Sequence, residues 1–289
     1  MSDRPPLRDV IARHGLDARR SLGQHFLLDA NLTARIVRAA GDLHGRHVIE
    51  IGPGPGGLTR ALLDAEPLSV TAVEIDPRAV AAIEELAASD PRLSVLASDA
   101  MQVDLAAHTG APRQVVANLP YNVASPLLVK LLRQAAAFER LTLMFQQEVA
   151  ERICAPPASA AYGRLSVLAQ WTCDVDIALR VPAAAFVPPP KVSSAVVSLT
   201  PHAVQPDAPT FARMERLTAA AFGQRRKMLR SALKLMGGNE LLRAAAIDPE
   251  RRAETLTVGE FNRLLTSPAL ALALGGREGD QREAPRRQS

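Results

Sequence analysis

The side chains best suited to chemistry lie in one short turn, Asn118-Leu119-Pro120-Tyr121. The side-chain oxygen of Asn118 and a neighbouring carbonyl held by Pro120 offer two acceptors for the N–H groups of an exocyclic amine. Both hydrogen bonds favour a tetrahedral nitrogen and aim its delocalised lone pair at an electrophile, by positioning and electrostatics. Tyr121 offers a face on which a base can stack. Only 3% of the residues are aromatic, which favours this interpretation over a strand-ending turn with a core tyrosine.

A glycine-rich loop precedes this turn, with Gly52, Gly54 and Gly57 in the pattern G-x-G-x-x-G. The pattern occurs in proteins that bind NAD, FAD or S-adenosylmethionine, and a tight turn without a ligand is the alternative. A dinucleotide needs backbone N–H groups for its pyrophosphate, whereas Pro53 and Pro55 each remove one. S-adenosylmethionine has no phosphate and needs mainly a close approach of the backbone, which glycine permits. The loop therefore favours S-adenosylmethionine.

Two acids follow expected strands at positions suited to the same ligand. Glu74 lies near the end of a strand expected over 69–75, where ribose hydroxyls can donate to its carboxylate. Asp99 follows a strand expected over 93–97, where an adenine amino group can donate to it. Either acid alone is commonly a helix cap or a solvated side chain. With the glycine loop, they predict a nucleoside site at the carboxyl ends of successive strands.

These positions require a sheet whose strands end at one edge. Apolar runs typical of buried strands lie at 47–51, 69–75, 93–97, 114–117 and 141–145. Helical patterns alternate with them, at 31–40, 58–65, 77–88 and 125–136. This alternation predicts an α/β, Rossmann-like fold with a parallel, doubly wound sheet. Two later strands, at 174–181 and 193–199, extend it to about seven strands with an antiparallel edge.

Composition divides the chain into four parts. Residues 1–21 form a polar, basic arm that contains Arg19 and Arg20, and we expect a solvated, partly mobile terminus there. Residues 22–205 form the Rossmann-like domain, which ends in a proline-rich linker. Residues 206–272 carry only helical patterns and are expected to form a small all-helical domain. Residues 273–289 are polar and charged, which predicts a disordered tail.

Basic residues gather in the expected helical domain. Between positions 213 and 234 the only acid is Glu215, and the basic residues are Arg213, Arg216, Arg225, Arg226, Lys227, Arg230 and Lys234. Such a cluster fits contacts with RNA phosphates, although a solvated helix face is the alternative. We expect the contacts with RNA to come from Arg225, Arg226, Lys227 and Arg230.

Composition also excludes several classes of protein. The chain has 289 residues, of which 47% are hydrophobic and 22% charged, so wholesale disorder is excluded. No apolar run approaches the ~20 residues of a membrane helix, and the N-terminus lacks the apolar stretch of a secretory signal. Cys154 and Cys173 are too few for a disulfide framework, which favours the cytoplasm. No group of side chains has metal-ligand spacing, so we predict no metal site.

In order and spacing, the motifs resemble those of the ribosomal RNA adenine N6,N6-dimethyltransferases. This family modifies adjacent adenines near the 3′ end of bacterial 16S rRNA. The likeness runs from about Leu22 to Leu265, nearly the whole chain. Residues 22–27 resemble an N-terminal G-Q-N-F-L element that lies across the cofactor, with His25 where asparagine is usual. The other matching segments are 50–54, 74–76, 99–100, 118–122, 146–152, 162–166, 186–192 and 222–227.

The resemblance implies an enzyme that uses S-adenosylmethionine, releases S-adenosylhomocysteine and contains no metal. It implies a monomer in the cytoplasm that acts on 16S rRNA in the immature small ribosomal subunit, during ribosome biogenesis. Phe186 is implied to close the other side of the target adenine, so the expected catalytic residues are Asn118, Pro120, Tyr121 and Phe186. The expected cofactor-binding residues are His25, Leu27, Gly52, Gly54, Glu74, Asp99 and Asn118.

Three other functions fit part of the pattern. A resistance-type adenine N6-methyltransferase of 23S rRNA shares the fold and motifs, but the helical domain and the segment 188–191 favour the 16S substrate. A non-catalytic RNA-binding assembly factor would not need Asn118, Tyr121 and the two acids together. An NAD-dependent oxidoreductase is disfavoured by the two prolines of the glycine loop.

Overall fold

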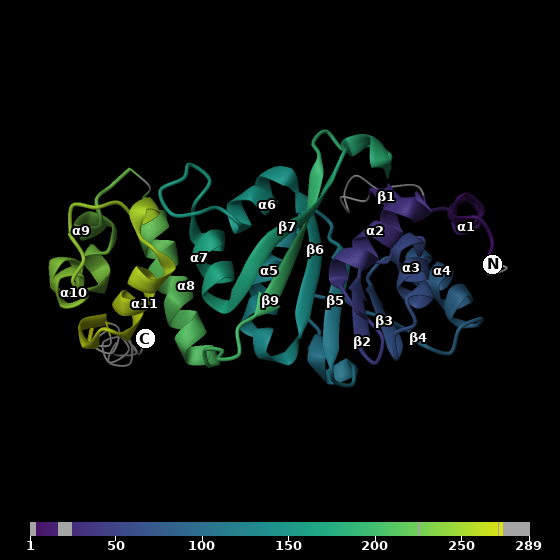
Figure 1. Cartoon of the computed structure of the whole chain (residues 1–289), viewed down its shortest axis with the longest axis horizontal. Coiled ribbons are helices and arrows are strands. Elements are labelled where there is room, and N and C mark those ends of the chain that lie inside the picture. Colours follow the sequence, from purple (N-terminus) through teal and green to yellow (C-terminus); the bar gives the residue numbers. More distant parts are fainter. Residues whose placement is uncertain (1–3, 17–24, 225, 271, 274–289) are drawn as a thin grey trace, which may run out of the picture. The chain divides into compact units, whose positions relative to one another are not determined.

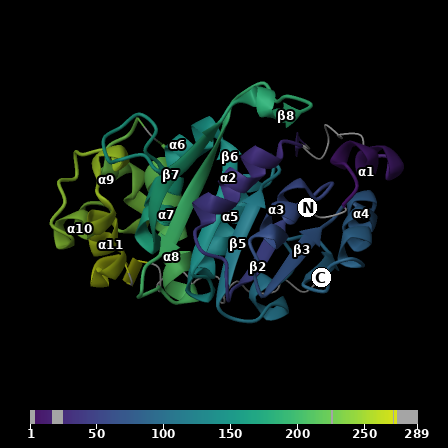
Figure 2. The same ribbon diagram turned by 45° about the vertical axis from the view of Figure 1, so that its right-hand side comes forward.

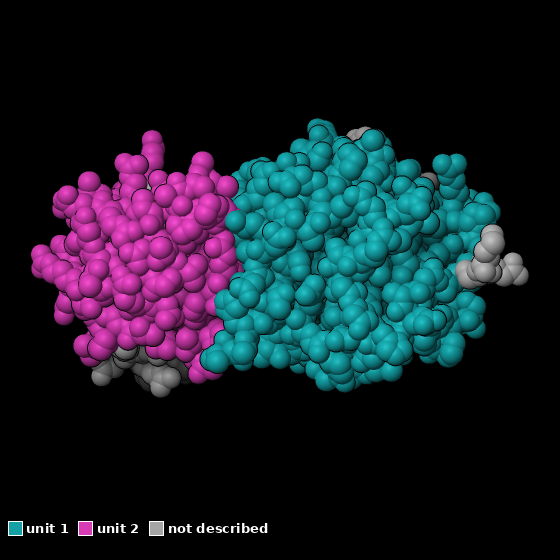
Figure 3. Space-filling view, viewed as in Figure 1, with its two compact units in different colours: residues 1–154, 172–205 teal, residues 155–171, 206–289 magenta. Residues whose placement is uncertain are grey.

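The computed structural model describes residues 4–16, 25–224, 226–270 and 272–273. The chain forms two compact units (Figure 3). Unit 1 comprises residues 1–154 and 172–205, and unit 2 comprises residues 155–171 and 206–289. The predicted disordered tail, apart from residue 273, lies outside the described residues, as do Arg19 and Arg20. No helix among the described residues is long and apolar enough to cross a membrane.

The centre of unit 1 is a sheet whose described strands follow the order β4-β3-β2-β5-β6-β9-β7 (Figure 1). The strands are β2 His47–Ile51, β3 Ser69–Glu74, β4 Leu93–Ala97, β5 Arg113–Asn118, β6 Arg140–Gln146, β7 Cys173–Val181 and β9 Ser194–Pro201. The pairs from β4 through β6 are parallel, and β9 is antiparallel to both β6 and β7. The predicted α/β fold with an antiparallel edge is therefore confirmed.

The α-helices described in unit 1 are α1 Leu7–Arg13, α2 Ala30–Ala40, α3 Gly57–Asp64, α4 Pro77–Ala87, α5 Ala124–Arg133 and α6 Gln147–Ile153, with short 3₁₀ turns η2 Leu105–His108, η3 Ala135–Ala137 and η4 Ala183–Ala185. Of these helices, α3, α4 and α5 connect parallel strands. The carboxylates of Asp29 and Asp76 cap α2 and α4, because each accepts a backbone N–H of the first turn. Pro77 opens α4, where no N–H is needed.

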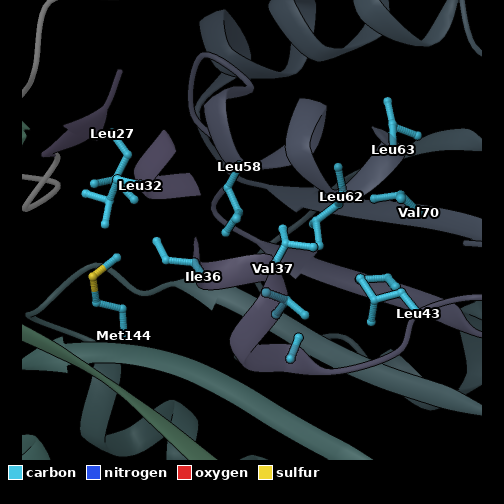
Figure 4. Close-up of a cluster of buried hydrophobic side chains, with 14 of the residues drawn as sticks. Leu27, Leu32, Ile36, Val37, Leu43, Leu58, Leu62, Leu63, Val70 and Met144 are labelled. Carbon is cyan, nitrogen blue, oxygen red and sulfur yellow. The ribbon is translucent and has the colours of Figure 1, made fainter. Parts of the chain in front are cut away.

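Both faces of the central strands of the sheet are buried. Figures 2 and 4 show α2 and α3 over one face, where Ile36, Val37, Leu58 and Leu62 pack together. Val116, Met144 and Val196, one from each of three neighbouring strands, belong to the same cluster. Because side chains alternate along a strand, Val115, Leu143 and Val197 face the opposite side, and they too are fully buried. Burial on both faces is typical of a sheet that is mainly parallel.

The N-terminal segment differs from the predicted solvated arm. Residues 7–13 form α1, and Val10 is only 4% exposed. It packs with Leu16, Phe26, Ala79 and Ala82 in a small apolar cluster. The composition of the arm is polar, but two spaced apolar side chains are enough to attach it to α4.

A second, two-stranded sheet was not predicted. β1 (Phe26–Leu27), labelled in Figure 1, and β8 (Phe186–Val187), labelled in Figure 2, pair antiparallel. Phe26 lies opposite Val187 and Leu27 lies opposite Phe186. Two residues have no detectable periodicity, so only the tertiary structure brings the two segments together.

Unit 2 is helical. Its described helices are α7 Arg164–Thr172, α8 Ala208–Phe222, α9 Leu229–Ala232, α10 Gly238–Ala244 and α11 Val258–Thr266, with 3₁₀ turns η5 Lys234–Met236 and η6 Ala253–Thr255. The last residue of α7, Thr172, already belongs to unit 1. The sequence placed residues 155–171 in the Rossmann-like domain, whereas they belong to this unit. The reason is packing: Tyr162 lies edge-to-face on Phe222, and the Trp171 indole N–H donates to Asn262.

Candidate active site

A cavity lies at the carboxyl ends of the central strands of unit 1. From β2 the chain continues to β3 and β4 on one side, whereas β5 and β6 lie on the other. In open α/β sheets, ligands bind at such a reversal of strand order. The cavity is lined by residues of four segments at the sheet edge and one segment before them. The residues are 25–27, 50, 52–55, 57–58, 74–75, 99, 101 and 118–123.

The glycines of the loop are needed for packing against β1 as well as for the approach of a ligand. A Cβ at Gly57 would lie 2.4 Å from the Leu27 carbonyl oxygen, and a Cβ at Gly54 would lie 3.2 Å from the Phe26 ring. Any side chain at Gly57 would therefore displace β1. The absence of side chains at these glycines lets β1 pack closely against the loop. The sequence analysis explained the glycines by the approach of a ligand alone, which is only part of their role.

Glu74 is held rigidly at the end of β3. Its carboxylate accepts backbone N–H bonds from Gly54 at 3.3 Å, Ile75 at 2.8 Å and Asp76 at 2.9 Å. It is 6% exposed, and burial raises its pKa although the three N–H donors oppose the shift. Replacing it by alanine would leave three backbone donors, two of them buried, without this acceptor, so a glutamine substitution tests ligand contact more cleanly.

Asp99 lines the same cavity, in a loop that α5 supports. Its Oδ1 accepts the Met101 N–H at 2.8 Å. The Lys130 ammonium donates to the carbonyl oxygens of Ala100 and Val103 and so ties the loop to the helix. Burial lowers the pKa of Lys130, and the nearby carboxylates oppose that shift. Sequence analysis did not identify Lys130, because a single lysine on a helix has no distinguishing local signal.

Glu50 is a second residue that the sequence analysis left without a role. It lines the cavity from the end of β2 and is 1% exposed. Among the residues that the structure describes, no group hydrogen-bonds its Oε2. Burial raises the pKa of Glu50 to about 8, and repulsion from Glu74 adds to the shift. An acid inside an apolar strand, directly before a glycine loop, was the available signal.

Asn118 is oriented by a backbone group. Its amide N–H donates to the His25 carbonyl oxygen at 3.2 Å, which leaves the amide oxygen as the acceptor for a substrate. The Pro120 carbonyl accepts the Val123 N–H at 3.1 Å and closes the turn that follows β5. The structure therefore brings Asn118 and Pro120 together with the two acids around one cavity.

Tyr121 is anchored by its hydroxyl. The Tyr121 oxygen lies 2.6 Å from the Oγ of Ser194, a buried residue at the start of β9. Burial raises the pKa of Tyr121, while this hydrogen bond opposes the shift. The hydroxyl is thus engaged within the protein, and the ring face is the part of Tyr121 available for stacking.

Phe186 lies deeper than the sequence analysis expected. It is 1% exposed and is not among the residues that line the cavity. The ring next to it is His25, at 6.4 Å between centroids and edge-to-face. A contact between Phe186 and a bound adenine, as the resemblance implies, therefore stays a prediction.

The expected RNA-binding residues lie in unit 2. Arg226 and Lys227 are exposed in the segment between α8 and α9. Arg230 is exposed and pairs with Glu250 at 3.3 Å, whereas Arg225 lies outside the described residues. The acid of the cluster, Glu215, is buried and pairs with Arg164, so it does not compete for phosphate at the surface.

The fold and the site together define an S-adenosylmethionine-dependent methyltransferase of the Rossmann-like class. Among the described residues, no cluster of side chains could hold a metal ion. The family model for ribosomal RNA adenine dimethylase matches residues 15–269. The chain therefore belongs to the ribosomal RNA adenine dimethylase family.

Curated relatives agree with this assignment. The ribosomal RNA small subunit methyltransferase A of Gluconobacter oxydans is 63% identical over 261 residues, which covers 90% of this chain and 86% of the relative. The protein of the same name from Paramagnetospirillum magneticum is 59% identical over 283 residues, or 97% of this chain and 98% of the relative.

Solved structures show the same fold. A dimethyladenosine transferase from Plasmodium falciparum has a TM-score of 0.72 and 26% identity, covering 83% of this chain and 96% of that one. The 23S rRNA methyltransferase ErmE has a TM-score of 0.63 and 25% identity, covering 83% and 98%. The predictions of a Rossmann-like methyltransferase and of an adenine-dimethylating enzyme are confirmed.

Proposed function

We propose that this protein transfers methyl groups from S-adenosylmethionine to N6 of two adjacent adenines near the 3′ end of 16S rRNA. The substrate is the immature small ribosomal subunit in the cytoplasm, during ribosome biogenesis. The observation that carries the proposal is that Asn118 and Tyr121 line one cavity with Glu74 and Asp99. The small-subunit names of relatives that are 59–63% identical support 16S rather than 23S rRNA.

The cavity fits this cofactor by the chemistry of its side chains. Glu74 and Asp99 offer carboxylate oxygens to ribose hydroxyls and an adenine amine, and Gly52, Gly54, Leu27 and the backbone of His25 offer a close surface. The buried Oε2 of Glu50, which no described residue hydrogen-bonds, suits the ammonium group of a methionine moiety. When bound, S-adenosylmethionine supplies a sulfonium methyl, which is the electrophile.

The protein orients the amine that receives the methyl group. The Asn118 amide oxygen accepts an N–H bond from N6 of adenine, and the backbone of the 118–121 turn provides the second acceptor. The two hydrogen bonds favour a tetrahedral nitrogen. The lone pair of such a nitrogen is localised and points at the methyl group, so no strong base is needed. Tyr121, fixed by Ser194, stacks on the base and holds it at the cavity.

The test is methyl transfer from labelled cofactor to small subunits isolated from cells that lack this modification, followed by mapping of methylated adenines. We expect two adjacent N6,N6-dimethyladenines near the 3′ end of 16S rRNA. Large-subunit RNA is the control and should stay unlabelled. Label confined to 23S rRNA would instead identify the resistance-type activity, and RNA binding without label would indicate a non-catalytic factor.

A further inference from the structure

The loop that follows β4 brings Asp99 and Met101 to the cavity with little support from the sheet. Among the described strands, β4 pairs with β3 alone and lies at the end of the sheet. The chain then passes β3 and β2 before it enters β5, and η2 is the one helical element that the structure describes in this connection, 98–112. A long connection without a helix of its own needs contacts from elsewhere to hold a fixed shape.

Lys130 provides such contacts from α5. Its ammonium donates to the carbonyl oxygen of Ala100 at 2.6 Å and also to the carbonyl oxygen of Val103. The carboxylates of Asp99 and Asp104 favour the charged form of Lys130, against the effect of burial on its pKa. The ammonium therefore holds the loop as a bound cation would, with two carbonyl oxygens as its ligands.

Asp99 belongs to the same turn as the two carbonyls. Its Oδ1 accepts the Met101 N–H at 2.8 Å. Its carbonyl oxygen accepts the N–H of Gln102 at 2.8 Å and that of Val103 at 3.2 Å. These hydrogen bonds make residues 99–103 one compact turn, so a change at the carbonyls that Lys130 binds also changes the direction of the Asp99 carboxylate.

The helix that carries Lys130 is itself fixed in the core of unit 1. Four leucines of α5 are at most 1% exposed, namely Leu127, Leu128, Leu131 and Leu132. The helix begins at Ala124, directly after the turn that contains Asn118 and Tyr121. Because these leucines hold the helix in place, loss of the Lys130 ammonium should disturb the 99–103 turn and leave the 118–121 turn where it is.

We propose that Lys130 is a positioning residue for the cofactor, because its ammonium fixes the 99–103 turn that directs Asp99 at the adenine end of S-adenosylmethionine. This rests on the proposed function, which places that cofactor in the cavity. An ammonium suits the task because it offers three N–H donors from one atom, so two carbonyls can converge on it. Since Lys130 acts on the nucleoside end, its loss should weaken every ligand that contains adenosine by the same factor.

The experiment compares the parent with Lys130→Met, which removes the ammonium, and with Lys130→Gln, which keeps a donor without the charge. Calorimetry gives the dissociation constants of S-adenosylmethionine, S-adenosylhomocysteine and adenosine, and methyl transfer to unmethylated small subunits gives kcat. We expect Lys130→Met to raise all three constants on the order of tenfold, with kcat at saturating cofactor within about twofold of the parent. Lys130→Gln should lie between the two. Arg133→Met, at an exposed position of the same helix, is the matched control and should behave as the parent does.

A double-mutant cycle with Asp99→Asn shows whether Lys130 acts through Asp99. If it does, Lys130→Met weakens binding much less in the Asp99→Asn background than in the parent. Losses that simply add would overturn the proposal, as would a loss for S-adenosylmethionine that S-adenosylhomocysteine does not share.

Thermal unfolding verifies that each variant is folded. A lower unfolding temperature of Lys130→Met with parent-like dissociation constants would give Lys130 a structural role only and overturn the proposal. If the parent protein itself bound none of the three ligands, the proposed function would be wrong instead.

Discussion

At the scale of single residues, most polar atoms of the site are already engaged within the protein. The Asn118 amide N–H binds the His25 carbonyl, and the Tyr121 hydroxyl binds Ser194. The Glu74 carboxylate accepts three backbone N–H groups. Groups fixed in this way do not need to reorganise during reaction, which is the condition for strong electrostatic stabilisation of a transition state. We therefore propose that the Asn118 oxygen and the Tyr121 ring face are the groups that contact the substrate.

Asn118→Ala tests the positioning of the amine. We expect methyl transfer to fall on the order of 10²-fold or more, as when a positioned hydrogen-bond partner is removed from an oxyanion hole. Cofactor affinity should stay largely intact. Single-turnover kinetics on unmethylated small subunits measure the chemical step, and Asn239→Ala on exposed α10 is the control. Methyl transfer at the parent rate would refute the mechanism.

Glu50→Gln tests the buried carboxyl through the pH dependence of stability. The folded-state pKa is raised from 4.5 to about 8, so the folded chain holds a proton that the unfolded chain releases. This contribution to stability is complete below about pH 4.5 and is lost as pH rises through about 8. Without cofactor, we expect the variant to gain stability over the parent between pH 5 and 8, on the order of 3 kcal/mol.

Thermal unfolding at several pH values measures that gain. Glu84→Gln is the matched control, because Glu84 is exposed on α4 and should show no such trend. A difference between Glu50→Gln and the parent that stayed constant from pH 5 to 8 would mean that Glu50 is ionised in the folded protein.

At the scale of elements, the pair β1 and β8 joins the two halves of the site. β1 crosses the glycine loop so closely that only glycine fits at Gly57. β8 carries Phe186 and leads to Pro188, whose carbonyl holds the His25 ring. We therefore expect a change in the loop to reach the base side through the two residues of β1.

Gly57→Ala tests this coupling. Its Cβ would lie 2.4 Å from the Leu27 carbonyl, so β1 must shift. Overpacking of this kind costs about 1–3 kcal/mol, and we expect cofactor and subunit affinities to fall together, each on the order of tenfold. Gly259→Ala in α11 is the control, because the nearest atom to its Cβ lies at 3.9 Å. Loss of cofactor affinity alone would show that β1 and β8 act independently.

At the scale of the whole molecule, we propose that one unit carries out the chemistry and the other contacts the RNA substrate. The cavity belongs entirely to unit 1, whereas the exposed Arg226 and Lys227 belong to unit 2. Phosphate contacts carry most of the affinity for RNA without reading its sequence. Unit 2 therefore suits recognition of the ribosomal particle, and unit 1 suits selection of the base.

Reversal of Arg226 and Lys227 to glutamate tests that division. We expect weaker RNA binding with a flatter dependence on salt, since each lost phosphate contact lowers the slope by about 0.7–0.9. Cofactor affinity should be unaffected. Binding measured from low to high salt gives the slope, and reversal of Arg35 and Arg38 on α2 is the charge-matched control. An unchanged slope would make the basic segment a solvated face.

Local patterns in the sequence were sufficient to predict the parallel sheet, the edge that the site residues share and the start of the helical region. Alternating strands and helices predicted the parallel sheet, because periodicity and helix-capping residues are read over a few neighbouring positions. Gly52, Glu74, Asp99 and Asn118 could be placed at one edge, because the carboxyl ends of parallel strands coincide. The boundary of the helical region near residue 206 followed from the change in composition.

Only the tertiary structure decided the contacts between distant segments. The positions of residues 155–171 in unit 2 and of β1 beside β8 depend on packing partners far away in the chain. For the same reason, no local pattern showed that Phe186 is buried beside His25, or that one oxygen of Glu50 has no hydrogen-bond partner among the described residues. Spacing determines which side chains share an edge of the sheet, whereas burial and hydrogen bonding depend on the whole surrounding fold.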